Sequence, residues 1–124
     1  MVPSQKQLDL SEFRGQRSTA FTGRPQGEQA REKLDLDTLD RDATAQEIHL
    51  RIPSGTTSFN PSFYLGLLFE SIKKLGPDQF QQRYKLDVVD QNPELKRILQ
   101  NNINDGLRNA LNTIQGEKRN WITW

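Results

Sequence analysis

The sequence predicts an α/β fold, a small sandwich in which helices pack on a short mixed or parallel sheet. Segments whose apolar residues alternate with polar ones are separated by segments whose apolar residues recur every three or four positions. The intervening segments are about ten residues long or more, which favours crossover helices over a hairpin meander. The expected order is strand, loop, helix, strand, helix, strand, helix.

Residues 1–20 are expected to hold the first strand and a loop. Within KQLDLSEF (6–13), Leu8 and Leu10 alternate with polar residues, and Phe13 lies one step out of phase. Residues 14–25 contain two glycines, a proline and three hydroxyl residues, typical of a loop with a short extended piece around Phe21. Residues 28–39 follow with apolar residues near helical spacing, which predicts the first helix.

The segment 47–52 is the clearest predicted strand, because Ile48, Leu50 and Ile52 alternate with polar residues. After the loop 53–59, Asn60 is a suitable N-cap, and Pro61 suits the first helical position because it needs no backbone donor there. A core helix with a broad apolar arc is therefore predicted from this point to the stop at Gly76-Pro77.

The third predicted strand is 83–89, followed by a long amphipathic helix that starts at Pro93 and ends near residue 112. We take residues 21–114 as the main α/β domain and 115–124 as an apolar C-terminal tail beyond a glycine break. Trp121, Ile122 and Trp124 in this tail either fold back over the sheet or make a dimer contact, so both a monomer and a homodimer remain open.

The composition and charge of the chain argue against several classes of function. The chain has no cysteine, which excludes disulfides, thiolate metal sites and a cysteine nucleophile. Its longest apolar run is far below the roughly 20 residues of a membrane span, and its N-terminus lacks the apolar core of a signal peptide, so no membrane contact and a cytoplasmic location are expected. Seventeen basic and sixteen acidic residues give a net charge of +1, unlike a typical nucleic-acid-binding protein.

No residue pattern indicates catalysis, so we expect no enzyme, no catalytic residue, no metal and no cofactor. The single histidine, His49, lies mid-strand without a recognisable acid/base constellation and is expected on the surface. An acidic cluster lacks the glycine and glutamate of a calcium loop and is interpreted as a solvated helix end; it comprises Asp35, Asp37, Asp40 and Asp42. The glycines at 23, 27 and 55 lack a P-loop lysine, although a small-molecule site at Gly55 remains a third possibility.

The loop SGTTSFNPS (54–62) is the leading candidate for binding, because partners of open α/β sheets meet loops at the carboxyl ends of strands. Ser58 and Ser62 stand at the start of the next helix, where a phosphate would add roughly −1.5 to −2 charge near the positive end of the helix dipole. Ordinary turn and capping chemistry is the alternative for both serines. The candidate partner-binding residues are Gly23, Arg24, Ser54, Thr56, Thr57, Ser58, Asn60 and Ser62.

Three stretches carry a resemblance to a known family: FTGRPQGEQAR (21–31), FNPSFYLGLLFE (59–70) and NPELKRILQNNI (92–103). Over about residues 21–111 the chain resembles the bacterial STAS-like family of unknown function, which is similar to the STAS domains of sulfate transporters and anti-sigma-factor antagonists. The resemblance implies a module that binds a protein, in relays with an ATPase-type kinase that phosphorylates a serine. Ser62 would correspond to that serine, although Asn60-Pro61-Ser62-Phe63 replaces the Asp-Ser-Ser-Gly motif of the antagonists.

Our leading hypothesis is therefore a non-catalytic STAS-like regulatory module that binds a protein partner. The alternative is a nucleic-acid-associated or phage- or defence-related regulator, including an inhibitor of a host defence system. Its contacts would be Arg14, Arg17, Arg24 and Arg31 on phosphates, with Trp121 or Trp124 stacking on bases.

Overall fold

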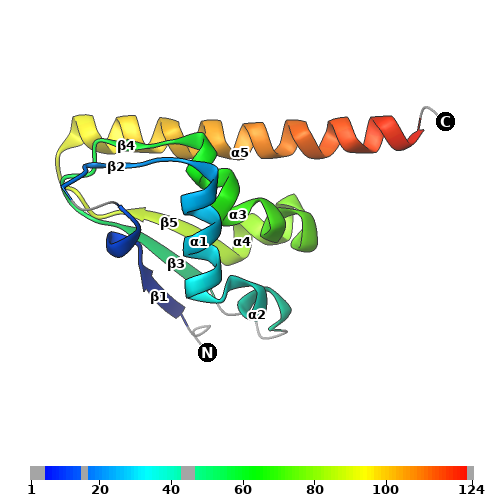
Figure 1. Ribbon diagram of the computed structural model, residues 1–124, viewed down its shortest axis with the longest axis horizontal. Helices are drawn as coiled ribbons and strands as arrows, with labels where there is room; N and C mark the ends of the chain where they lie inside the picture. Colours follow the sequence, from blue (N-terminus) through cyan, green and yellow to red (C-terminus); the bar gives the residue numbers. More distant parts are fainter. Residues whose placement is uncertain (1–4, 15–16, 43–46, 123–124) are drawn as a thin grey trace.

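The computed structural model describes residues 5–14, 17–42 and 47–122, with side chains as far as residue 116 (Figure 1). It confirms the predicted α/β class. The main sheet contains β1 (Gln5–Asp9), β3 (Glu47–Ile52) and β5 (Tyr84–Val88) in the order β1-β3-β5. Both outer strands run parallel to β3, so this sheet is parallel and not mixed.

Two short strands at one end of the main sheet form a second, two-stranded sheet. A 3-10 helix, η1 (Ser11–Phe13), follows β1. Further on, β2 (Ala20–Phe21) pairs in parallel with β4 (Ser58–Phe59). β2 is the short extended piece expected around Phe21, whereas β4 lies within the predicted loop 53–59.

Five helices complete the described chain: α1 (Arg24–Leu34), α2 (Leu36–Arg41), α3 (Pro61–Leu75), α4 (Pro77–Arg83) and α5 (Pro93–Ile122). α1 and α2 connect β1 to β3, and α3 and α4 connect β3 to β5. α1 packs directly on α3, so both crossovers cover the same face of the main sheet. α5 packs on the other side of α3 and runs past the rest of the domain (Figure 1).

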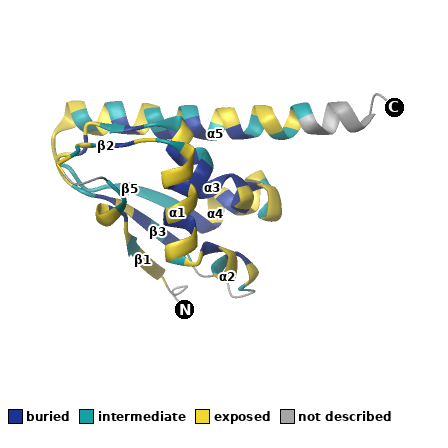
Figure 2. Ribbon diagram, viewed as in Figure 1, coloured by how far each residue is buried: buried dark blue, intermediate teal, exposed yellow. Residues whose placement is uncertain are grey.

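Strand alternation separates a buried face of the sheet from a polar face. Ile48, Leu50 and Ile52 are buried under the helices, whereas Arg51 on the opposite face is exposed. The register aligns Leu8 with Leu50 and Leu50 with Leu86, so the outer strands present apolar residues to the same side. Figure 2 shows the buried residues concentrated along β3 and α3.

Aromatic residues close the core at the end of the sheet where β2 and β4 pair. The rings of Phe21, Phe59 and Phe63 lie with centroids 5.1 to 5.2 Å apart, and all three are fully buried. Tilted and edge-on ring pairs of this kind add to the free energy of burial alone. They attach the short β2–β4 sheet to the first turn of α3.

Two glycines set the distance between α1 and α3. A Cβ added at Gly27 would lie 2.3 Å from the carbonyl oxygen of Phe63, and one added at Gly66 would lie 2.2 Å from the carbonyl oxygen of Arg24. The two helix backbones therefore touch directly at this crossing. As a result, the N-terminal ends of α1 and α3 lie next to each other.

Local signals located the central elements correctly. β3 has the predicted bounds, and α3 begins at Pro61 after the N-cap Asn60, whose Oδ1 accepts a hydrogen bond from Ser62 N–H at 2.8 Å. Gly76, with φ 83°, ends α3 as predicted. Gly76 is also the N-cap of α4, a helix that the sequence analysis did not assign.

Three predicted boundaries were wrong. The first strand ends at Asp9, because Leu10–Phe13 turn into η1. The helix predicted at 28–39 begins earlier and is divided at Asp35, which adopts the left-handed conformation with φ 54° and caps α1 through its N–H. The glycine at 116 does not break α5, which continues to Ile122 because one helical glycine costs only about 1 kcal/mol.

The C-terminal tail is only partly described. Its backbone from Gln115 to Ile122 belongs to α5, whereas Trp124 lies outside the described residues, as does the side chain of Trp121. The two alternatives for these tryptophans therefore stay predictions. Among the described residues, no helix combines the length and apolar character needed to cross a membrane.

Candidate partner-binding surface

The loop between β3 and α3 presents polar residues at the carboxyl end of the central strand. Ser54, Gly55, Thr57 and Ser62 are exposed, and Ser58 and Asn60 are half-buried. We call these six residues the loop surface. The remaining candidate of this segment, Thr56, is fully buried and cannot contact a partner in this conformation.

Arg14 holds the first part of the loop. Its Nη1 donates to the carbonyl oxygen of Ser54 at 3.2 Å and to Oγ1 of Thr56 at 2.9 Å. The Thr56 hydroxyl in turn donates to the carbonyl oxygen of Pro53 at 2.8 Å. Arg14, a candidate phosphate ligand on sequence grounds, therefore serves as an internal support of the loop surface.

Asp90, which follows β5, holds the tip of the loop. Gly55 N–H donates to Asp90 Oδ2 at 2.8 Å, and Asn92 N–H donates to Oδ1 at 2.9 Å. The Gly55 bond, followed by the Asn92 bond, lowers the pKa of the Asp90 carboxyl below its ordinary value. Gly55 itself has φ 80°, a conformation that glycine adopts without strain.

The second half of the loop is joined to two further segments. Thr57 N–H donates to the carbonyl oxygen of Thr19 at 2.7 Å, and the two threonine hydroxyls lie 2.8 Å apart. Phe59 N–H donates to Oδ1 of Asn102 on α5 at 2.8 Å. The loop is thus held by chain segments before α1, after β5 and on α5.

Ser58 and Ser62 differ in their setting. Ser62 is exposed in the first turn of α3, two positions after the N-cap, where an anionic group interacts favourably with the helix dipole. Ser58 is half-buried and belongs to β4, in register with Ala20. Ser62 is therefore the more accessible of the two for modification.

Gly23 and Arg24 lie beside the start of α3, but the Arg24 side chain does not point toward the loop surface. Gly23 is the N-cap of α1 with φ 86°. The Arg24 guanidinium lies over the ring of Phe69 at 5.5 Å, and its Nε is 3.7 Å from Glu28 Oε1. Since Phe69 follows Ser62 by two helical turns, the Arg24 charge is about 10 Å along α3 from the loop surface.

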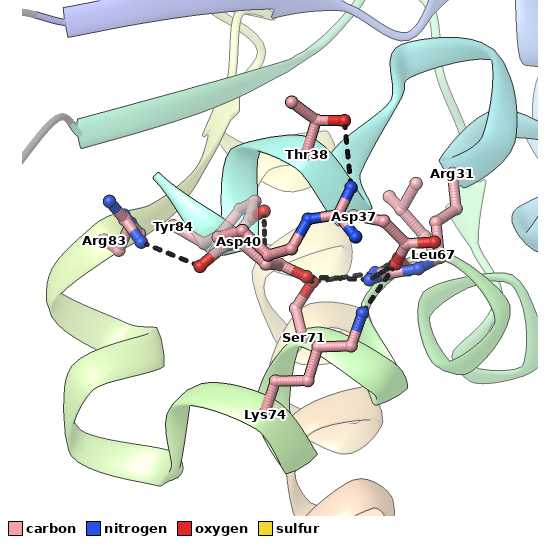
Figure 3. A network of polar contacts seen from close by, with 10 residues as sticks. Arg31, Asp37, Thr38, Asp40, Leu67, Ser71, Lys74, Arg83 and Tyr84 are labelled. Carbon is pink, nitrogen blue, oxygen red and sulfur yellow. Dashed lines mark hydrogen bonds and ion pairs between the residues drawn. The ribbon is translucent and has the colours of Figure 1, made fainter. Parts of the chain in front are cut away.

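Arg31 is buried and does not belong to a binding surface (Figure 3). Its Nη2 contacts Asp37 Oδ1 at 2.6 Å and Asp40 Oδ2 at 2.7 Å. Its Nη1 donates to the carbonyl oxygen of Leu67 at 3.0 Å and to the Ser71 hydroxyl at 2.7 Å. Burial opposes the charged guanidinium, but Asp37 and Asp40 together raise the pKa of Arg31.

Asp40 corrects the interpretation of the acidic cluster as a solvated helix end. Its side chain is 1% exposed, and it accepts hydrogen bonds from Ser71 and Tyr84 as well as from Arg31. Burial, followed by the bond to Asp40, raises the pKa of the Tyr84 hydroxyl above its ordinary value. Figure 3 shows these side chains converging from α1, α2, α3 and β5, so this buried polar network joins the helices to the sheet.

His49 also differs from its sequence interpretation. Its Nδ1 lies 2.8 Å from Asp87 Oδ2 and its Nε2 lies 3.8 Å from Glu47 Oε1. The side chain is only 17% exposed, and Nε2 has no hydrogen-bond partner among the described residues. Parallel pairing of β3 with β5 brings His49 next to Asp87. Alternation within each strand predicts which face a side chain occupies, but not its neighbour on the next strand, so the sequence alone did not reveal this contact.

Neither His49 nor the acidic cluster makes a metal site. Among the described side chains of residues 5–14, 17–42 and 47–116, no group of three or more histidine, aspartate or glutamate residues could hold a metal ion. Within the cluster, the carboxylate of Asp37 contacts Arg31, and that of Asp40 contacts both Arg31 and the Ser71 hydroxyl.

Comparisons with models of known protein families, with curated protein sequences and with solved structures give no match.

Proposed function

We propose that the protein is a non-catalytic regulatory module of the cytoplasm that binds a protein partner through the loop surface. The observation that supports this proposal is that the loop surface is exposed and is also held in place by internal hydrogen bonds. Four of the six residues of the loop surface are exposed, yet the loop is bonded to Arg14, Asp90 and Thr19. A loop already held in one conformation loses little entropy on binding, so more of its contact energy contributes to affinity.

We also propose that Ser62 is a site of regulatory phosphorylation. Its exposure, and its position in the first turn of α3, support the proposal, because the positive end of the helix dipole stabilises a phosphate. The added charge would lie within the loop surface. A partner that docks on a neutral surface would then have to desolvate a dianion, and its affinity would fall.

The STAS-like resemblance enters this proposal as a hypothesis about the partner. A parallel sheet with helices on one face, and a helix that starts after the central strand with Ser62 in its first turn, are compatible with that family. On this hypothesis the partner is an ATPase-type kinase or another regulator in the same relay.

Site-specific crosslinking tests the proposal. A photoreactive amino acid placed at Ser62 in the full chain, expressed in its source cells, should give a discrete covalent adduct with one protein. The matched control carries the same amino acid at Gln79, an exposed position on α4. We expect no adduct at position 79. Equal adducts at both positions, or an adduct that nuclease treatment abolishes, would contradict docking of a protein on the loop surface.

Affinity measurements with the purified adduct partner then separate docking from switching. Thr57→Arg should weaken binding by roughly tenfold or more, since an exposed contact residue is replaced by a large charged one. Ser62→Asp should weaken binding while Ser62→Ala leaves it almost unchanged. If Thr57→Arg binds as the native chain does, the surface is wrong; if only Ser62→Asp has no effect, the switch is wrong.

A further inference from the structure

The outer edge of β5 offers unpaired backbone groups. In the described sheet β5 pairs with β3 alone, and Val89 N–H donates to the carbonyl oxygen of Ile52 at 3.2 Å. Successive strand residues direct their backbone groups to opposite sides, so the N–H and C=O groups of Leu86 and Val88 face the open edge. No residue in the described part of the chain bonds to them. Such an edge is a template for another strand.

A groove follows this edge because α5 runs beside β5. One section, of about 640 Å³, lies between Val88 and the start of α5 at Pro93, Lys96 and Arg97. A second section, of about 340 Å³, lies toward Tyr84 and is lined by Phe80, Ile103 and Leu107. Leu86, Asp87 and Gln100 line both sections, so the two are continuous. We call this feature the β5–α5 groove.

The section near Val88 is lined by two cations, Lys96 and Arg97, whereas the section near Tyr84 is lined by one, Lys85, beside apolar side chains. Lys96 and Arg97 are exposed and form no salt bridge with a described residue, although the charge of Lys96 helps to lower the pKa of the Asp90 carboxyl. Asp87, the carboxylate among the lining residues, is hydrogen-bonded to His49. The end near Val88 therefore favours an anionic ligand, whereas Ile103 and Leu107 favour apolar side chains at the end near Tyr84.

We propose that the β5–α5 groove binds an extended acidic protein segment, which joins the main sheet as a strand next to β5. Edge hydrogen bonds to Leu86 and Val88 supply affinity, and the two ends of the groove select a segment with acidic residues at one end and apolar residues at the other. A second copy of this chain fits less well. Two-fold symmetric pairing of two β5 edges is antiparallel, so it would place the Lys96–Arg97 pair of each copy beside the Lys85 end of the other, where like charges repel. The β5–α5 groove is separate from the loop surface, and this proposal does not depend on the function proposed for the loop surface.

Peptide binding to the full chain tests this proposal. The probes are two short fluorescent peptides of equal composition, with valines in one half and glutamates in the other, synthesised in the two opposite orders. Fluorescence anisotropy should show saturable binding of one order, weakened by salt. Lys96→Glu with Arg97→Glu should reduce affinity roughly tenfold, whereas Arg108→Glu, outside the groove on the same helix, should have little effect.

Backbone pairing is tested separately from charge. N-methylation of alternate residues in the binding peptide should abolish binding, because it removes strand donors and keeps every side chain. Val88→Pro should also abolish binding, because it removes the outward-facing N–H of Val88. The variant should still fold, since proline is tolerated at an edge position whose N–H faces outward, and circular dichroism and thermal melting check this. Binding that survives N-methylation, absence of binding by both peptides, or a native dimer that Val88→Pro dissociates would overturn the proposal.

Discussion

Asp40 shows how much free energy one buried side chain can control. Its carboxylate accepts hydrogen bonds from Arg31, Ser71 and Tyr84, and its side chain is 1% exposed. The carbonyl oxygen of Asp40 is also within reach of Arg83 Nη1, at 3.4 Å. Removing this carboxylate would leave a buried guanidinium with a single, half-exposed carboxylate partner, Asp37.

Asp40→Ala should therefore lower the free energy of unfolding by about 3–5 kcal/mol, the usual cost of breaking a buried ion pair. Urea denaturation followed by circular dichroism measures this change. Glu70→Ala, at an exposed position on α3, is the matched control and should change the free energy by less than about 0.5 kcal/mol. A loss for Asp40→Ala as small as that of the control would mean that the network contributes no net stability.

Asp37 predicts a pH dependence of stability. The hydrogen bond from Lys74, followed by that from Arg31, lowers the pKa of Asp37 to about 2. A lowered folded-state pKa stabilises the protein above the unfolded pKa of about 3.9, and this contribution is lost as the pH falls toward 2. Native protein should thus be more stable than Asp37→Asn at neutral pH, with a difference that shrinks between about pH 4 and 2.

Urea denaturation at a series of pH values checks this difference. Asp37 is 56% exposed, so solvent screens its ion pairs and the effect at neutral pH should be modest and smaller in high salt. Asp78→Asn, at an exposed position on α4, serves as the control for a general carboxylate effect. An Asp37→Asn difference that does not change with pH would contradict the lowered pKa.

At the scale of elements, the crossing of α1 and α3 depends on glycine. Gly27→Ala would force a Cβ to within 2.3 Å of the Phe63 carbonyl oxygen and 2.8 Å of the Leu67 nitrogen, both backbone atoms that cannot rotate away. The helices must separate, at a cost of about 1–3 kcal/mol or more. Thermal and urea denaturation should show this loss.

Gly116→Ala is the matched control for this crossing. Gly116 is also helical, but a Cβ there would meet no atom within 4 Å. Alanine should leave the free energy of unfolding unchanged or raise it by up to about 1 kcal/mol, because it favours the helix. If both substitutions behave alike, helix propensity and not close packing determines the effect at Gly27.

Local signals were sufficient for some elements and not for others. Asn60-Pro61 and Gly76-Pro77 act through capping and backbone geometry within a few residues, so both ends of α3 could be predicted. The division between α1 and α2 could not, because Asp35 takes a left-handed conformation that is more common for glycine. Its αL conformation is accompanied by hydrogen bonds to the Arg31 and Glu32 carbonyl oxygens.

At the scale of the whole molecule, the two proposed surfaces lie on different parts of one sheet. The loop surface follows the carboxyl end of the central strand, and the β5–α5 groove follows an edge strand. Asp90 and Asn92 lie in the connection between β5 and α5, where Asp90 holds the loop tip and Asn92 caps the start of α5. One short connection thus positions both surfaces, although each is tested by its own experiment.

The local sequence determined the α/β class, the buried face of β3 and the start of α3, because hydrophobic periodicity and capping act over a few neighbouring residues. Tertiary structure alone decided the partners of the polar side chains. Arg31 meets Asp40 and Ser71, and His49 meets Asp87, only after helix packing and strand register bring distant segments together. A charge has no periodicity that reveals its partner, so packing decides whether an arginine faces a ligand or a buried carboxylate.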